Sequence, residues 1–439
     1  MDTHFHPGLL LAAALWLAPG AARGQEQAAP PAPAAEPATE PAPAEGTSLD
    51  STLEAGESEF QEPKRRLVKF NEYEGPYIGI RVGGGFLFEG AAYSQDAASR
   101  GQFPLAADTK VRDARVMLKV RFPKLKRLTF STGIMYDGVT DEWLFRETGF
   151  MIAVPELWGH LFIGRTKEGF SLNKVMVGYA GWTMERATIS DATIPILADG
   201  IKWLGYLPKR GFLWNLGVYT DLVSKGQSFS TYQNQAVARL MWLPIASEKK
   251  GTLLHLGVSL RYGKPLDNTL RLRSRPEANP APYFVDTENF TSPNTRMVGV
   301  EAYYRPGRWL FGTEYFVQKA SSHPNGNPLF HGGDVVVSWL VTGETRSYNT
   351  RGGFFNAVSP NKTVFEGGPG AWEAVARFSY IDLDDQGIHG GKFWRVTPML
   401  NWHMSDNVRL EFAYGYGILD RFSAKGETLF FQSRLQLSL

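Results

Sequence analysis

The stretch GKFWRVTPMLNWHMSDNVRLEFAYGYG, residues 391–417, carries two runs of alternating apolar and polar side chains on either side of a short turn. From Trp394 to His403, apolar side chains occupy the even positions and mostly polar ones the odd positions. After Ser405-Asp406, the same alternation runs from Val408 to Tyr416. Successive side chains of a β-strand point to opposite faces. The stretch therefore predicts two antiparallel strands, each with one apolar and one polar face.

Similar alternation continues outward from this stretch, for example over 254–262 and 309–317, with aromatic side chains near the strand ends, where a membrane interface holds them. A soluble β-sandwich also alternates, but here the polar face is charged over many strands and no helical segment competes. We predict an all-β fold, a transmembrane antiparallel β-barrel of about sixteen strands that is wide enough for a channel. The expected strands are residues 77–92, 111–121, 127–137, 147–155, 158–166, 200–207, 212–221, 232–244, 252–262, 296–305, 308–318, 333–343, 372–382, 391–403, 406–417 and 428–439.

Composition agrees with a barrel and argues against a helical membrane protein. The 439 residues include no Cys, 46 Gly and 57 aromatic residues (28 Phe, 17 Tyr and 12 Trp). The mean hydropathy is −0.24, and the longest apolar run, Leu9–Leu17, is too short to span a bilayer as a helix. Barrels keep an ordinary average hydropathy because only alternate residues face lipid.

The N-terminal region divides into two expected segments ahead of the barrel. Residues 1–24 are typical of a secretory signal peptide, with an apolar stretch, a Pro-Gly break and cleavage after Ala22 or Gly24. Residues 25–74 begin Ala/Pro/Glu-rich and predict a disordered periplasmic tether. Residues 75–439 then form the barrel, in the outer membrane of a Gram-negative bacterium.

Charge is distributed unevenly along the chain. Residues 1–62 hold ten acidic side chains and one basic side chain, which leaves 45 Lys and Arg against 34 Asp and Glu, a net charge of +11, for residues 63–439. A basic folded body indicates an anionic partner. No nucleic-acid-binding motif accompanies the charge, so small anions and membrane phosphates are the expected partners.

The stretch GRTKEGFSLNKVMVGYAGWTMER, residues 164–186, begins at the end of an expected strand and continues as a cationic connection with Arg165, Lys167, Lys174 and Arg186. We expect it to fold into the lumen and narrow the pore, with Lys174 and Arg186 facing the anion path and Arg165 and Lys167 as secondary candidates. A solvated surface loop is the alternative.

A second basic stretch, LRLRSRPE at 270–277, repeats arginine at every second position. In an extended chain this spacing places Arg271, Arg273 and Arg275 on one face. Guanidinium groups pair with phosphate through two parallel hydrogen bonds, and neighbouring weak sites let an anion move along them. The alternative is that these arginines lie at the cell surface and contact lipopolysaccharide phosphates.

Enzyme signatures are missing from the sequence. The GGG at 83–85 lacks the Gly-Lys-Ser/Thr of a phosphate loop, and no Gly-x-Ser-x-Gly elbow occurs. The eight histidines show no metal-ligand spacing. We therefore expect no catalytic residues, no metal and no cofactor, although a Ser/His hydrolase built on a barrel stays open as an alternative.

Four segments in order resemble the phosphate-selective porin O and P family. They are GRTKEGFSLNK with WTMERA (164–187), LRLRSRPE (270–277), WLVTGETRSYN (339–349), and GAWEAVARFSYIDLDDQGIHGGK with LNWHMSDNVRLEFAY (370–414). The resemblance covers nearly the whole expected barrel. It implies a trimeric, sixteen-stranded outer-membrane channel for phosphate or related anions such as pyrophosphate and polyphosphate.

The resemblance also assigns residues to the anion path. Lys174 falls on the family's central lysine, and Arg186 on the arginine of its Glu-Arg pair. The remaining matched and candidate positions are Arg81, Arg112, Arg271, Arg273 and Arg275, with Arg115 and Arg146 as secondary pore candidates. Asp113, Arg146 and Asn349 depart from the family's pattern, which bears on strict phosphate selectivity. The sequence thus predicts an anion-selective porin. A general-diffusion porin, an outer-membrane hydrolase and a plugged structural barrel are the alternatives.

Overall fold

The computed structural model describes residues 71–439 except 139, 177, 224–230 and 248–249. The expected signal peptide, residues 1–24, and all but the last four residues of the expected tether lie outside the described residues. Glu72–Glu74, at the end of that tether, forms the short strand β1, which pairs with the first long strand.

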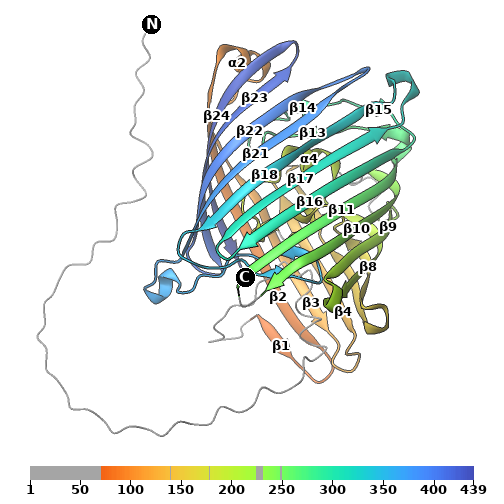
Figure 1. Cartoon of the computed structure of the whole chain (residues 1–439), viewed down its shortest axis with the longest axis vertical. Helices are drawn as coiled ribbons and strands as arrows, with labels where there is room; N and C mark the ends of the chain where they lie inside the picture. Colours follow the sequence, from red (N-terminus) through yellow and green to blue (C-terminus); the bar gives the residue numbers. More distant parts are fainter. Residues whose placement is uncertain (1–70, 139, 177, 224–230, 248–249) are drawn as a thin grey trace, which may run out of the picture. The chain divides into compact units, whose positions relative to one another are not determined.

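Sixteen strands of the described chain close into one antiparallel barrel, because the last strand, β24, pairs with the first long strand, β2, through contacts such as Phe88 with Leu435 (Figure 1). All sixteen expected strands are confirmed. They are β2 (Gly79–Gln95), β3 (Asp108–Arg121), β4 (Leu128–Asp137), β6 (Thr148–Val154), β7 (Gly159–Thr166), β8 (Ala198–Leu207), β9 (Phe212–Thr220), β10 (Tyr232–Ser247), β11 (Thr252–Pro265), β16 (Thr295–Pro306), β17 (Trp309–Ala320), β18 (Leu329–Leu340), β21 (Ala371–Asp385), β22 (Ile388–His403), β23 (Val408–Arg421) and β24 (Ala424–Ser438).

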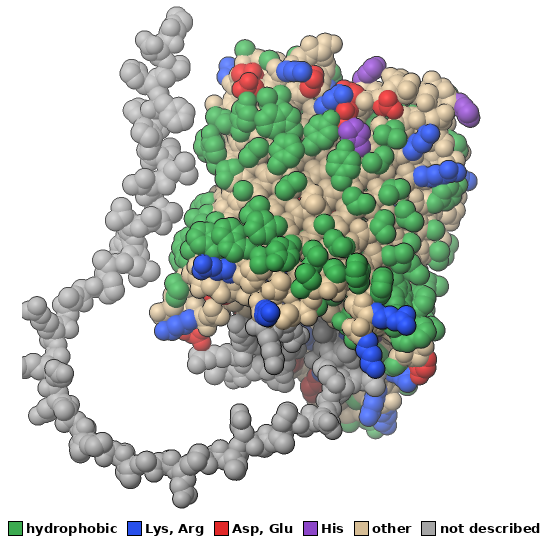
Figure 2. Space-filling model, in the orientation of Figure 1, with side chains coloured by type: hydrophobic (Ala, Val, Ile, Leu, Met, Phe, Trp, Pro, Cys, Tyr) green, Lys and Arg blue, Asp and Glu red, His purple; other side chains and the backbone are tan. Residues whose placement is uncertain are grey.

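Alternation along each strand separates an apolar outer wall from a polar lumen. On β17, Phe311 and Tyr315 are exposed on the outside, while Glu314 between them is 1% exposed and faces inward. Figure 2 shows hydrophobic side chains spread over the outer wall, with charged ones concentrated towards the two rims. This is the arrangement that a strand with one face in lipid requires.

The barrel has two different ends. We call the end with the tight β16–β17 turn at Gly307, where β24 also ends, the turn end. The opposite end, which carries the connections 167–197 and 266–294, is the loop end. The long connection 344–370, whose length predicts an extracellular or inward-folded segment, leaves from the turn end, since it follows β18. Part of it folds inward, where Phe354 and Phe355 are buried.

Several short elements lie within the connections and were not predicted. They are β5 (Glu142–Phe145), α2 (Ala97–Gln102), α3 (Leu172–Val175), α4 (Thr188–Thr193), and the two-residue ladders β12 (Thr269–Leu270) with β15 (Phe290–Thr291), β13 (Arg273–Ser274) with β14 (Val285–Asp286), and β19 (Tyr348–Asn349) with β20 (Phe354–Phe355). No helix in the described ranges is long and apolar enough to cross a membrane.

Inward segments fill much of the lumen with two apolar clusters. One gathers Phe170, Ile189 and Phe284 from the two connections of the loop end. The other surrounds Trp182, which is fully buried, with partners that include Tyr303 and Phe355. The prediction that residues 164–186 fold into the lumen is confirmed. The position of this segment decides where the cationic side chains lie.

Candidate anion-binding site

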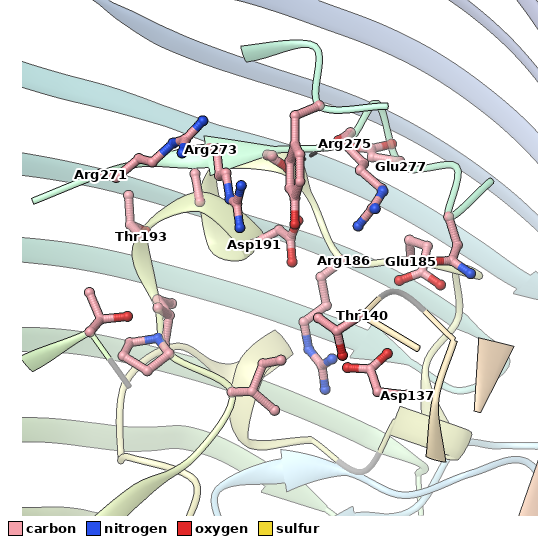
Figure 3. Close-up of a pocket in the computed structure, with 18 of the residues that line it drawn as sticks. Asp137, Thr140, Glu185, Arg186, Asp191, Thr193, Arg271, Arg273, Arg275 and Glu277 are labelled. Atoms are coloured by element: carbon pink, nitrogen blue, oxygen red, sulfur yellow. Dashed lines mark hydrogen bonds between the residues drawn. The ribbon is translucent and has the colours of Figure 1, made fainter. Parts of the chain in front are cut away.

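A cavity of about 350 Å³ lies between the inward segment and the 266–294 connection. Its lining includes five candidate arginines from three parts of the chain: Arg112, Arg186, Arg271, Arg273 and Arg275. Four carboxylates line the same cavity: Asp137, Glu185, Asp191 and Glu277. Figure 3 shows these groups, apart from Arg112, around one space, on different elements. Five of the seven principal candidates are therefore brought together, although they are up to 163 positions apart in the sequence.

The start of the inward segment is attached to two carboxylates of the barrel wall. Glu314 accepts hydrogen bonds from the Ser171 hydroxyl (2.6 Å) and the Asn173 backbone N–H (3.0 Å). Glu301, directly opposite Glu314 on β16, accepts from the Leu172 N–H at 2.8 Å. Ser171 has a φ of 69°, a left-handed conformation that is uncommon for a residue with a side chain, and these bonds help to hold it.

The middle of the inward segment is attached through its own backbone carbonyls. Wall and loop side chains donate one hydrogen bond or more to each of six consecutive or nearly consecutive residues. The pairs are Gln436 to the Tyr179 carbonyl (3.0 Å), Arg346 to Ala180 (2.8 Å), Arg409 to Gly181 (2.7 Å), Asn401 to Trp182 (2.9 Å), Arg434 to Met184, and Arg377 to Glu185 (2.8 Å). We call these six donors the carbonyl anchors. They fix the path of the chain at the centre of the lumen.

Lys174 lies on α3 and is 5% exposed. It is not among the residues that line the cavity. Burial is the main reason that its pKa falls to about 7; the nearby positive charge of Arg186 lowers the pKa further, whereas Asp191 and Glu168 raise it. Its ammonium group is therefore a cation whose charge changes near neutral pH.

Arg186 joins the cavity to the α3 region. Its guanidinium donates to the carbonyls of Asn173 (3.0 Å) and Met176 (3.2 Å), on either side of Lys174 in the sequence. Burial lowers its pKa, although it stays far above neutral pH because arginine starts so high. Carbonyl acceptors hold the side chain in place, and no ion pair within the described part of the chain neutralises it.

Arg112 belongs to an ion-pair group that also lines the cavity. It contacts Glu185 at 2.9 Å and Asp137 at 3.2 Å. Burial alone raises the pKa of the Glu185 carboxyl, but Arg112 and Arg434 outweigh that effect and keep it below its ordinary value. Glu185 is thus a permanent anion that compensates Arg112.

The three arginines of 270–277 keep the expected spacing and line the same cavity, but their surroundings differ. Arg271 forms an ion pair with Asp286, with both contacts at 2.6–2.8 Å. Arg273 and Arg275 both stack on the Tyr283 ring, at 4.2 Å and 4.5 Å from its centroid. The ring therefore supports both guanidinium groups at the cavity wall.

The other candidates lie away from the cavity lining. Arg81 contacts Glu72 at 3.7 Å near the turn end. The secondary candidates are buried and bonded within the protein: Arg165 to Asp199 (2.8 Å), Lys167 to the Met176 carbonyl (3.1 Å), and Arg115 to Asp113 (2.8 Å), while Arg146 is buried near Asp113 and Arg186.

Three candidate cations lack an ion-pair partner within the described ranges: Lys174, Arg186 and Arg273. Arg186 and Arg273 line the cavity, so their charge is the most available to an anion there, whereas Lys174 is buried and is not part of the lining. Sequence reasoning missed the carbonyl anchors Arg346, Arg377, Arg409 and Arg434, and also Arg395, which donates to the Pro276 carbonyl at 2.6 Å. Their only signal is that each strand arginine falls on the polar face of its strand.

Known proteins resemble this chain in sequence and in fold. The model of the phosphate-selective porin O and P family matches residues 126–437. An uncharacterized protein of Caulobacter vibrioides is 34% identical over 173 residues, which cover 38% of this chain and 34% of the relative. Porin O of Pseudomonas aeruginosa is 23% identical over 195 residues, which cover 37% of this chain and 43% of Porin O. The chain thus spans about a third of the length of the Caulobacter vibrioides relative and less than half of the length of Porin O.

Among solved structures, an anion-selective porin from Comamonas acidovorans superposes with a TM-score of 0.52. The two chains are 12% identical, and the match covers 82% of this chain and all of the other. At this identity the likeness shows the outer-membrane β-barrel fold. The family match covers well over half of the chain, and so the chain belongs to the phosphate-selective porin O and P family as an outer-membrane porin.

Proposed function

We propose that this porin conducts small anions passively, with phosphate and related phosphoryl anions as its preferred substrates. The observation that carries the proposal is the arrangement of Arg186 and Arg273 around one lumenal cavity, where neither has an ion-pair partner among the described residues. An anion entering the cavity would supply the missing negative charge. Arginine suits phosphate because its planar fork matches two phosphate oxygens.

Further support comes from the mixture of charges in the lining. The carboxylates Asp137, Glu185, Asp191 and Glu277 limit the net positive charge, and Glu277 is itself paired with Arg377. Conduction requires binding that is favourable enough for entry and weak enough for release. A cavity with partly compensated arginines meets that requirement better than an uncompensated cluster.

The proposal includes no covalent chemistry, and it includes a homotrimer, as the resemblance to the porin O and P family implies. The Comamonas acidovorans protein with the same fold is an anion-selective porin. We also propose that residues 1–24 are removed on export and that residues 25–74 act as a periplasmic spacer.

Planar bilayer recording of the purified full-length protein tests the proposal. In a KCl gradient, the reversal potential should show preference for chloride over potassium, and added phosphate should reduce the chloride current in a saturable manner. The variant Arg273→Gln should weaken this phosphate block several-fold. Equal permeability to potassium and chloride, with no phosphate block, would favour a general-diffusion porin and contradict the proposal.

A further inference from the structure

Three cations stand together on the outer wall of the barrel, near the loop end. They are Lys264 at the end of β11, Arg296 at the start of β16 and Lys319 at the end of β17, and all three side chains are exposed. Each faces the same way as an apolar residue two positions towards the barrel middle: Tyr262, Val298 and Val317 respectively. We call Lys264, Arg296 and Lys319 the outer-wall triad. It lies at the border between the apolar wall and the loop-end rim.

The strand register brings the triad close together. Arg296 pairs directly with Lys319 across β16 and β17, and with Tyr262 across β11 and β16. Lys264, two residues beyond Tyr262, is therefore a diagonal neighbour of Arg296. Directly opposite side chains on one face lie about 5 Å apart at Cβ and diagonal ones roughly 7–8 Å, so one anionic group can reach all three cations.

No counter-charge compensates the triad within the described ranges. Neither an ion pair nor a side-chain hydrogen bond links Lys264, Arg296 or Lys319 to any other described residue. Like charges opposite each other on a sheet face repel and destabilise the pairing. Elsewhere the barrel's cations commonly have partners: Lys392, for example, contacts Asp382 at 2.8 Å. The positive charge of the triad is therefore left without a negative partner in the described part of the chain.

An apolar groove of about 700 Å³ runs along the outer wall beside the triad. Its floor is β10, where the small side chains Ala236 and Ala238 face outward. In the register of the sheet, Ala236 lies between Val218 and Tyr262. Arg296 lines the groove as well, and thus belongs to both features. Figure 2 shows basic side chains above hydrophobic ones in this region, where β11, β16 and β17 reach the loop end in Figure 1.

We propose that this surface binds a phosphorylated glycolipid of the outer leaflet, with a phosphate on the outer-wall triad and one acyl chain in the groove. Long connections of outer-membrane barrels lie on the extracellular side, so the loop end faces the outer leaflet. Lipid chains are as apolar as the wall, so the groove favours an acyl chain only by matching its shape. The preference for a phosphorylated lipid over other lipids comes from the phosphate contacts. The site is separate from the lumenal cavity, because the triad points away from the lumen.

Native mass spectrometry of the detergent-purified full-length porin, titrated with bis-phosphorylated lipid A, tests this proposal. The triple variant Lys264→Gln, Arg296→Gln, Lys319→Gln should bind the lipid roughly tenfold or more weakly, since each surface cation contributes to phosphate attraction. The matched control replaces three exposed cations of the turn end: Lys126→Gln, Lys209→Gln and Arg210→Gln. It should bind as the unchanged protein does. Millimolar inorganic phosphate should not displace the lipid, because the groove contact would be missing.

A second variant tests the groove without changing charge. Ala238→Trp places a large side chain in the groove and should weaken binding of lipid A several-fold. Heat-modifiable gel mobility shows that the barrel of this variant is folded. Unchanged lipid affinity in both the triple variant and Ala238→Trp would overturn the proposal. So would loss of the oligomer with lipid affinity retained, because that result would assign this face to a subunit contact.

Discussion

Glu314 on β17 accepts a hydrogen bond from the backbone N–H of Asn173 at 3.0 Å, and so the wall of the barrel holds the residue that directly precedes Lys174. The second oxygen of the same carboxylate accepts the Ser171 hydroxyl at 2.6 Å. Both bonds are buried, and a hydrogen bond within a folded protein contributes about 0.5–1.5 kcal/mol. The position of α3 therefore depends on a carboxylate that is 141 residues away in the sequence.

Replacing Glu314 by Ala should loosen the inward segment. Both acceptors are lost, while the Asn173 N–H and the Ser171 hydroxyl stay buried, so we expect an increase in open-channel current noise and faster hydrogen exchange at residues 171–175. Bilayer recording and exchange mass spectrometry measure these effects. Glu142→Ala, at an exposed position, is the control. Identical exchange in both variants would show that Glu314 does not hold α3.

The charge of Lys174 should make anion preference depend on pH near neutrality. Its pKa of about 7 means that the side chain is protonated below this pH and neutral above it. Phosphate block should therefore weaken as pH rises from about 6 to 8.5, after correction for the ionisation of phosphate itself. In Lys174→Arg, phosphate block should stay strong over this whole pH range, because arginine stays charged. In Lys174→Gln, phosphate block should stay weak over the same pH range, because glutamine is uncharged. A wild-type pH profile in Lys174→Arg would assign the titration to another group.

Reversing the charge at Lys174 should have a larger effect than neutralising it. At an effective dielectric constant near 20, a unit charge about 4 Å away interacts by on the order of 4 kcal/mol before screening. A quarter of that value corresponds to roughly a fivefold change in occupancy. Lys174→Glu should weaken phosphate block by at least this factor and raise potassium permeability. Lys425→Glu is the comparison, since Lys425 is 74% exposed at the start of β24. Equal responses would remove Lys174 from the anion path.

The Tyr283 ring should matter through the two guanidinium groups that it supports. Tyr283→Leu removes the stacking surface of Arg273 and Arg275 and should weaken phosphate block about two- to fivefold, because exposed cation–π contacts contribute about 0.5–1 kcal/mol. Tyr283→Phe keeps the ring and should behave as the unchanged protein does. If the leucine and phenylalanine variants lose block equally, the hydroxyl and not the ring face is what matters.

The strands could be predicted from the sequence because their signal is local. A period of two marks each strand, and all sixteen were located to within a few residues, including the closing strand Ala424–Ser438. β5 was missed because only four residues, Glu142–Phe145, alternate there. From its length, the connection 344–370 was expected to be extracellular or folded inward; it folds inward, but from the turn end, which its length does not indicate.

The candidate site could be predicted only in part. Arg112, Arg186 and the 271–275 arginines share one cavity, as a common anion path requires, whereas Arg81 lies at the turn end and Lys174 is buried beside the cavity. Whether these residues bind anions stays a prediction. The carbonyl anchors could not be foreseen, because Arg409 meets the Gly181 carbonyl across 228 residues and a backbone oxygen leaves no mark in the sequence.

The carbonyl anchors have a consequence for how such a channel can change. Since Gln436, Arg346, Arg409, Asn401, Arg434 and Arg377 all grip main-chain oxygens, the hold on residues 179–185 is largely indifferent to which side chains occupy them. Mutations in that segment can alter the substrate preference of the lumen while its course stays fixed. The carbonyl anchors set the course of the inward segment independently of its side chains. New transport specificities can therefore evolve in this segment without a new fold.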